Sequence, residues 1–173
     1  MKKVKEEKTP LIYKERGILK KIDFSDTFST INKQDTLKEI ANLIFNDPPN
    51  WVKLLFTLRN KMVKIIGLKN SVPKGFKETF DVGGYIGFFK IYAISNSEII
   101  LGADDSHLNF RAIILKDNTS DYNIKTITLV EYNNMKGSIY MSLIKPFHRI
   151  VVKSLVKKAY KNKYHITTKP QKI

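Results

Sequence analysis

The segment LGADDSHLNFR, residues 101 to 111, holds the side chains of this sequence that are best suited to chemistry. Asp104 and Asp105 are adjacent carboxylates, His107 is an imidazole and Arg111 is a guanidinium. Such groups can transfer protons and stabilise an anion, so they are candidates for acid–base catalysis or for orienting a ligand. The same segment also fits a hairpin turn, because Asp and Ser side chains bond neighbouring amides and Gly102 tolerates unusual dihedral angles.

The direction of these side chains decides between the two interpretations. In a strand, alternate side chains point to opposite faces, which predicts one polar and one apolar set: His107, Asn109 and Arg111 against Leu108, Phe110 and Ala112. The apolar set has the better claim on the interior. The polar set then forms a solvated strip, with Arg111 paired to an acid on the next strand, or faces a cavity mouth, with Asp105 fixing the His107 tautomer.

A metal site is not expected from these residues. Adjacent carboxylates on a strand point to opposite faces, and the other two histidines, His148 and His165, are distant in sequence. The chain also has no cysteine, which excludes disulfides, thiol catalysis and Cys-ligated metals. We expect neither a metal nor another cofactor.

Two further groups of polar residues are candidates for ligand contacts. His148 and Arg149 follow Pro146, which is predicted to open the last helix, so they can bind an anionic ligand head or pair with an internal carboxylate such as Asp104 or Asp105. Arg59 lies within an apolar helix pattern, where a guanidinium snorkels to solvent, pairs with an acid or contacts a ligand.

The net charge of +15 does not by itself indicate nucleic-acid binding. It comes from 27 lysines and only four arginines, whereas phosphate recognition favours arginine. The charge is uneven, because Tyr132 to Ile173 contains nine lysines, Arg149 and no acidic residue. Neither a signal-peptide core nor a transmembrane run is present, so we expect a cytoplasmic protein; its oligomeric state cannot be assigned from the sequence.

The elements that must position these residues follow an α+β pattern, β-α-α-β-β-β-β-β-α. Residues 1–20 are predicted to be a loosely ordered arm, 21–163 one domain and 164–173 a basic tail. A strand is predicted over Ile22 to Ile31. Helices are predicted after the capping box of Thr36 and Glu39, and from the Asp47-Pro48 start to Gly67.

The region from residue 79 to residue 144 is predicted to be an antiparallel meander, because short turn-forming segments separate runs of strand-forming residues. The predicted strands are Thr79 to Val82, Tyr85 to Ser95, Glu98 to Gly102, His107 to Lys116, Tyr122 to Tyr132 and Ser138 to Ile144. Phe147, Ile150, Val151 and Leu155 then share one face of a helix that begins at Pro146 and covers the curved sheet.

Several motifs together resemble an uncharacterised bacterial domain family of the START-like (SRPBCC, helix-grip) superfamily: PPNW, LRN and IGL between residues 47 and 68, VGGYIGFF, LGADDSHLNFR and GSIYMSLIKPFHR. The resemblance covers about residues 23 to 160. It implies a curved antiparallel sheet wrapped around a long C-terminal helix, with a hydrophobic cavity between them that in relatives holds lipids, polyketides, hormones or aromatic compounds.

We therefore expect a binding protein for a small hydrophobic molecule rather than an enzyme. The predicted ligand-binding residues are Arg59, Phe89, Asp105, His107, Arg111, Tyr140 and His148. One alternative is a cyclase- or isomerase-type enzyme that uses Asp105, His107 and Arg111. Another is docking of the basic C-terminal segment on an anionic membrane or nucleic acid.

Overall fold

The structure is a computed structural model that describes residues 2–55, 57 and 79–161. Residues 50–55 and 57 are helical, and the second half of the helix predicted to run to Gly67, with Arg59, lies outside the described residues. The labelled elements, in chain order, are β1 (Val4–Glu7), α1 (Leu11–Glu15), β2 (Phe24–Thr30), α2 (Leu37–Phe45), β3 (Tyr85–Ile86), β4 (Phe89–Ile94), β5 (Glu98–Asp104), β6 (Leu108–Lys116), β7 (Ile124–Tyr132) and α4 (Met135–Lys158).

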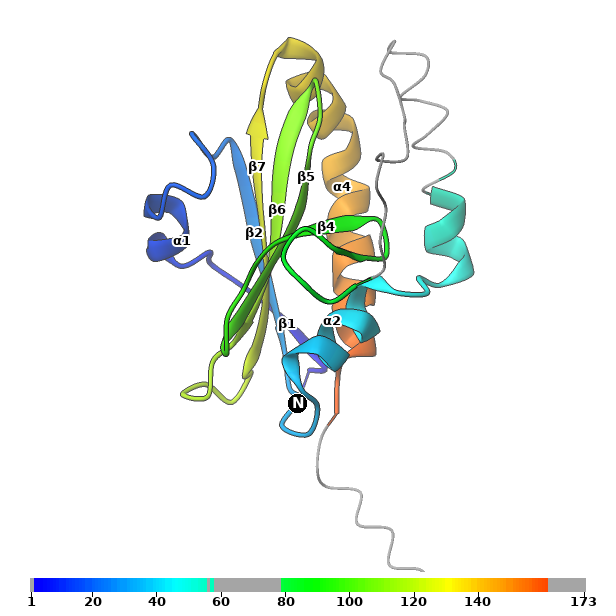
Figure 1. Cartoon of the computed structure of the whole chain (residues 1–173). Helices are drawn as coiled ribbons and strands as arrows, with labels where there is room; N and C mark the ends of the chain where they lie inside the picture. Colours follow the sequence, from blue (N-terminus) through cyan, green and yellow to red (C-terminus); the bar gives the residue numbers. More distant parts are fainter. Residues whose placement is uncertain (1, 56, 58–78, 162–173) are drawn as a thin grey trace, which may run out of the picture.

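The strands form one seven-stranded antiparallel sheet in the order β1-β2-β7-β6-β5-β4-β3. Strands β4 to β7 are joined as a meander, whereas β2 reaches across the sequence to pair with β7, with Phe24 opposite Val130. The sheet curves, and α4 lies along one of its faces (Figure 1). This is an α+β protein in which a long C-terminal helix covers an antiparallel sheet.

The main core lies between this face of the sheet and the two helices α2 and α4. It is built from alternate residues of β5 and β6 with the apolar sides of the helices: Ile99, Leu101, Ala112 and Ile114 with Ile40, Ile44, Leu155 and Ala159. Helix α2 starts where the sequence predicted, because Thr36 accepts the amide of Glu39 and the Glu39 carboxylate accepts that of Thr36. The capping box is confirmed.

The N-terminal residues do not form the loosely ordered arm that the sequence predicted. Strand β1 pairs with β2 from Val4 opposite Thr30, and Tyr13 of α1 is buried against the other face of the sheet. That face is apolar as well, through residues such as Ile113 and Leu129, and therefore needs a cover. The arm supplies it, and Tyr13 donates a hydrogen bond to Glu98.

The C-terminal helix also differs from the sequence prediction. The predicted strand Ser138 to Ile144 is instead the first part of α4, and Pro146 lies inside this helix rather than at its start. The helix begins after Asn134, whose side chain accepts the amide of Gly137. Tyr140 and Met141 are buried against the sheet, and this packing outweighs the hydrogen bond that a proline removes.

Smaller differences concern the residues before β4. Residues 79–82 form no strand, and the predicted strand Tyr85 to Ser95 is divided into β3 and β4 by a turn at Gly87, which has a φ of +56°. In that conformation a residue with a Cβ is strained, so glycine permits the turn. The predicted strands that correspond to β2, β5, β6 and β7 are confirmed, with ends that differ by a few residues.

Candidate functional site

The β5–β6 hairpin predicted from LGADDSHLNFR is confirmed, and its turn is bound by the segment that precedes α4. The amide of Asp105 donates to the carbonyl of Leu108 at 3.0 Å, which closes the turn. The side-chain amide of Asn133 donates to the carbonyl of Asp105 at 2.7 Å, and that of Asn134 to the carbonyl of Ser106 at 2.8 Å. Two asparagines thus join the turn to the start of the helix.

His107 is buried, with 1% of its surface exposed, and packs between this turn and α4. Its ring meets that of Tyr140 edge-on at 5.1 Å between centroids, and its Nδ1 lies 3.4 Å from a carboxylate oxygen of Asp105. His107 precedes β6, so it does not share the face of Asn109 and Arg111 as strand alternation predicted. The structure brings Asp105, His107 and Tyr140 together.

Arg111 lies on the opposite face of the sheet, which it shares with Ile113 and not with α4. Its guanidinium donates to both carboxylate oxygens of Asp104, at 2.7 and 3.3 Å, and lies 3.7 Å from the ring centroid of Tyr92. A Cβ at Gly102 would lie 2.9 Å from the Arg111 Cδ, so glycine leaves room for this side chain. Arg111 is paired with an acid, but with Asp104 on the preceding strand, β5, and not with one on the next strand.

Charge and burial in this group explain two pKa shifts. Partial burial acts to raise the pKa of Asp104, but hydrogen bonds from Arg111 and Tyr92 outweigh it and hold that pKa below its ordinary value. Burial, with the hydrogen bond to Asp104, raises the pKa of Tyr92 to about 12. Because Asp104 already occupies its guanidinium, Arg111 does not converge with Asp105 and His107, contrary to the arrangement that the enzyme hypothesis required.

Phe89 is partly buried against the core near α2, and it lines neither of the two pockets described below. Its ring contacts Phe45 and Phe110 edge-on, at 5.2 and 5.5 Å between centroids. These contacts are ordinary aromatic packing.

His148 faces a buried carboxylate that the sequence analysis had not selected. Its Nε2 lies 3.3 Å from Oδ2 of Asp26 on β2, and its ring meets Phe24 edge-on at 5.7 Å. The sequence predicts an internal carboxylate as one partner of His148, but at Asp104 or Asp105 rather than at Asp26. Strand alternation in the sequence could have identified Asp26 as an inward-facing residue. It shares the core-facing side of β2 with Phe24 and Phe28 at a period of two.

The polar groups around Asp26 are poorly satisfied. Among the described residues, neither Asp26 oxygen, nor the Nε2 of His148, nor the hydroxyl of Thr126 takes part in a hydrogen bond, although all are buried atoms. On β7, Thr128 lies opposite Asp26 and Thr126 lies opposite Phe28, so the side chain of Thr126 is on the same face of the sheet as Asp26. Buried polar atoms are usually hydrogen-bonded, so this cluster is a candidate contact point for a ligand.

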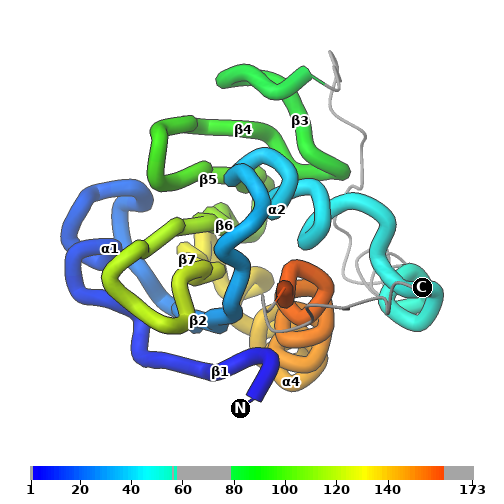
Figure 2. Tube along the Cα trace, turned by 90° about the horizontal axis from the view of Figure 1, so that it is seen from below, coloured from blue at the N-terminus to red at the C-terminus, as the bar shows by residue number. Residues whose placement is uncertain are grey.

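A cleft leads from the surface to Asp26. It has a volume of about 820 Å³ and lies between the β1–α1 segment, the start of β2 and α4. Figure 2 shows β1 and β2 beside α4. The lining is mixed: three residues are apolar (Pro10, Leu11 and Phe24), four are cationic (Lys8, Lys14, Lys145 and Arg149) and four are acidic (Glu6, Glu7, Asp23 and Asp26). Since β1 ends at Glu7, opposite Thr27, the edge of β2 from Phe24 to Asp26 is left uncovered by it. We call this space the β2–α4 cleft.

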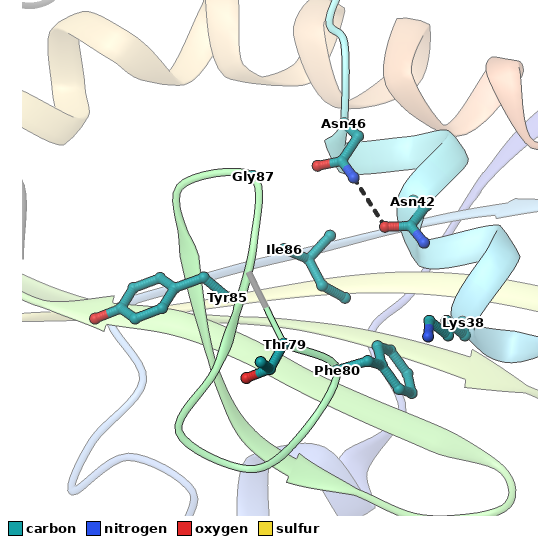
Figure 3. Close-up of a pocket in the computed structure, with 8 residues that line it drawn as sticks. All are labelled: Lys38, Asn42, Asn46, Thr79, Phe80, Tyr85, Ile86 and Gly87. Atoms are coloured by element: carbon teal, nitrogen blue, oxygen red, sulfur yellow. Dashed lines mark hydrogen bonds between the residues drawn. The ribbon is translucent and has the colours of Figure 1, made fainter. Parts of the chain in front are cut away.

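A second pocket, of about 160 Å³, lies between α2 and the residues around β3 (Figure 3). Its polar groups are largely engaged with each other: the Asn46 side chain donates to that of Asn42 at 2.9 Å, and Lys38 lies over the ring of Phe80. Its small volume and paired side chains make it a weaker candidate than the β2–α4 cleft.

The described residues form neither a metal-binding group nor a membrane-spanning helix. Across residues 2–55, 57 and 79–161, no group of three or more histidine or acidic side chains is placed to hold a metal ion. No helix in the same part of the chain is both long enough and apolar enough to cross a membrane.

Fold and cleft together define the class: an α+β protein with an antiparallel sheet, a long C-terminal helix and a buried Asp–His pair at the edge of their interface. The model of a family described as "Protein of unknown function (DUF2867)" matches residues 18–155, and the chain belongs to this family. The matched residues include both Asp26 and His148. No curated protein and no solved structure matches the chain.

Proposed function

We propose that this protein binds a small, largely apolar molecule that carries a hydroxyl or amino group, in the β2–α4 cleft. The observation that carries the proposal is the carboxylate of Asp26, which is buried and receives no hydrogen bond from the described residues. Its one ionic partner among the described residues is His148, at 3.3 Å, and a buried charge that receives no hydrogen bond is unfavourable. A ligand hydroxyl or ammonium group that donates to Asp26 removes this penalty, which makes the carboxylate a natural recognition group.

Three residues of the cleft can contact the apolar part of such a ligand. Phe24, Leu11 and Pro10 contribute this apolar surface, and Asp26 is one of the charged residues that line the cleft. His148 lies behind the lining, 3.3 Å from Asp26. Ligand sites are commonly apolar, with a few polar groups that orient the ligand, and of roughly 300–1,000 Å³. The volume of this cleft lies within that range.

We also propose that the fold is a START-like helix grip, which the antiparallel sheet and its long C-terminal helix support. The β2–α4 cleft does not lie where the family resemblance implied a cavity, which was between the sheet and the C-terminal helix. Apolar clusters pack between the sheet and α4 over much of their length, around Leu101 and Leu155 and around Phe28 and Val156. The β2–α4 cleft lies at the margin of this interface.

Paired ligands that differ in one group test the proposal. Titration calorimetry measures the binding of small aromatic and aliphatic alcohols and amines. For comparison, it also measures hydrocarbons of the same shape that lack the hydroxyl or amino group. We expect Asp26→Asn to weaken the alcohols and amines about tenfold, the effect of one hydrogen bond to a charged group, and to leave the hydrocarbons unchanged. Asp121→Asn, the same chemical change at an exposed position outside the cleft lining, is the matched control.

Native mass spectrometry of the purified protein provides a second measurement, because a resident ligand appears as added mass that solvent extraction removes. The proposal is wrong if no compound of either type binds to the wild-type chain. It is also wrong if Asp26→Asn and Asp121→Asn have equal effects on the donor-bearing ligands.

A further inference from the structure

One side of α4 is both apolar and open to solvent. Five large hydrophobic side chains on it are between 49% and 79% exposed and recur every three or four residues: Met135, Ile139, Leu143, Phe147 and Ile150. This spacing places them along one stripe of the helix. The buried residues Tyr140, Met141 and Leu155 lie on the other side, against the sheet. Single exposed apolar residues are common, but a continuous stripe marks a contact surface.

Positive charge continues the stripe toward the end of the helix. Lys153 and Lys157 follow Ile150 at the same helical spacing, are exposed, and form no ion pair with any residue that the structure describes. No acidic residue occurs in α4 or anywhere from Tyr132 to Ile173. We call this stripe, from Met135 to Lys157, the outer face of α4. Its partner must therefore accept apolar side chains and carry negative charge.

We propose that the outer face of α4 docks on the surface of a membrane that contains anionic lipids. A helix that lies in the membrane interface places residues such as Ile139 and Phe147 at the boundary between headgroups and acyl chains, and its lysines among the anionic headgroups. The same face of a second copy fits less well, because it carries no acidic residue that could pair with these lysines. This inference does not depend on the β2–α4 cleft.

Co-sedimentation with lipid vesicles tests the proposal. The full chain is mixed with vesicles of equal parts phosphatidylglycerol and phosphatidylcholine, or of phosphatidylcholine alone. We expect binding to the anionic vesicles and about tenfold weaker binding to the neutral ones. The triple variant Ile139→Ser, Phe147→Ser, Ile150→Ser should bind the anionic vesicles at least about tenfold more weakly, since apolar burial is lost.

The controls test whether binding depends on the outer face of α4 rather than on any exposed apolar residues or on the net positive charge. Ile12→Ser, Val82→Ser, Phe88→Ser removes three apolar residues outside α4 that are between 58% and 73% exposed, and should leave binding unchanged. Lys153→Gln, Lys157→Gln should weaken binding more than Lys20→Gln, Lys33→Gln, which has the same net charge.

Four results would overturn the proposal. The first is no binding to anionic vesicles, and the second is an equal loss in the two serine triples. The third is a loss in the lysine variant with none in the α4 triple, since that would indicate attraction by charge alone. The fourth is a stable dimer of the wild-type chain that the α4 triple dissociates, because it would assign the outer face to a second copy.

Discussion

Gly137, in the first turn of α4, lies directly against the carbonyl group of His107. A Cβ built on Gly137 would be 2.0 Å from the His107 oxygen, so only glycine allows the helix to approach the hairpin turn this closely. The amide of Asn133 donates to the same carbonyl at 3.0 Å. The start of α4 and the β5–β6 turn are therefore fitted to each other at the level of the backbone.

From this contact we predict that Gly137→Ala destabilises the protein, although alanine is the better helix former. The helix must move away from the turn, and an overpacked site of this kind costs about 1–3 kcal/mol. Urea denaturation measures the change. Ser142→Ala, at an exposed position of the same helix, is the control and should change the free energy of unfolding by less than about 0.5 kcal/mol. An unchanged or higher stability of Gly137→Ala would contradict the contact.

Asp26→Asn should stabilise the protein, because the carboxylate is a buried charge that receives no hydrogen bond among the described residues, and its ion pair with His148 lacks hydrogen-bond geometry and offsets only part of that cost. We expect a gain of about 1 kcal/mol in the free energy of unfolding. Asp23→Asn is the contrast: its carboxylate accepts the amide of Tyr132 at 2.6 Å, so the substitution should destabilise. If both variants lose stability equally, the Asp26 carboxylate has a structural role and the case for a ligand weakens.

Arg111→Lys should destabilise the protein even though the charge is kept. Lysine loses the two-point hydrogen bonding to Asp104 and the stacking on Tyr92, which together are worth about 1–3 kcal/mol. A double-mutant cycle with Asp104→Asn measures how much of the loss belongs to this pair. A cycle with no coupling energy would show that the pairing contributes nothing to stability.

The Glu98 carboxylate should make stability depend on pH in the acid range. Hydrogen bonds from Arg16 and Tyr13, working against partial burial, hold the pKa of Glu98 below its ordinary value of 4.5. The unfolded chain then takes up this proton first, so the stabilisation is complete above about pH 4.5 and declines as the pH falls through the lowered pKa. Glu98→Gln should show a flatter decline between neutral and acid pH, measured by urea denaturation. An identical pH profile in the variant would contradict the assignment.

Local patterns in the sequence predicted those elements whose cause is local. The Thr36–Glu39 capping box predicted the start of α2, and the turn residues around Asp105 predicted the β5–β6 hairpin, because the groups that bond there are neighbours in sequence. Strand alternation also placed Arg111 on the correct face of β6. A resemblance supplied the expectation of a C-terminal helix against a curved sheet, and the structure agrees with that arrangement.

The tertiary structure determined the features that depend on contacts between residues far apart in the sequence. The strand-like pattern of residues 138–144 forms part of α4 because Tyr140 and Met141 find a buried place against the sheet, and the N-terminal arm is ordered because a second apolar face needs a cover. The Asp26–His148 pair joins residues from β2 and α4 that are far apart in the chain. Only the packing of helix on sheet, which no local pattern encodes, brings these two side chains together at the cleft.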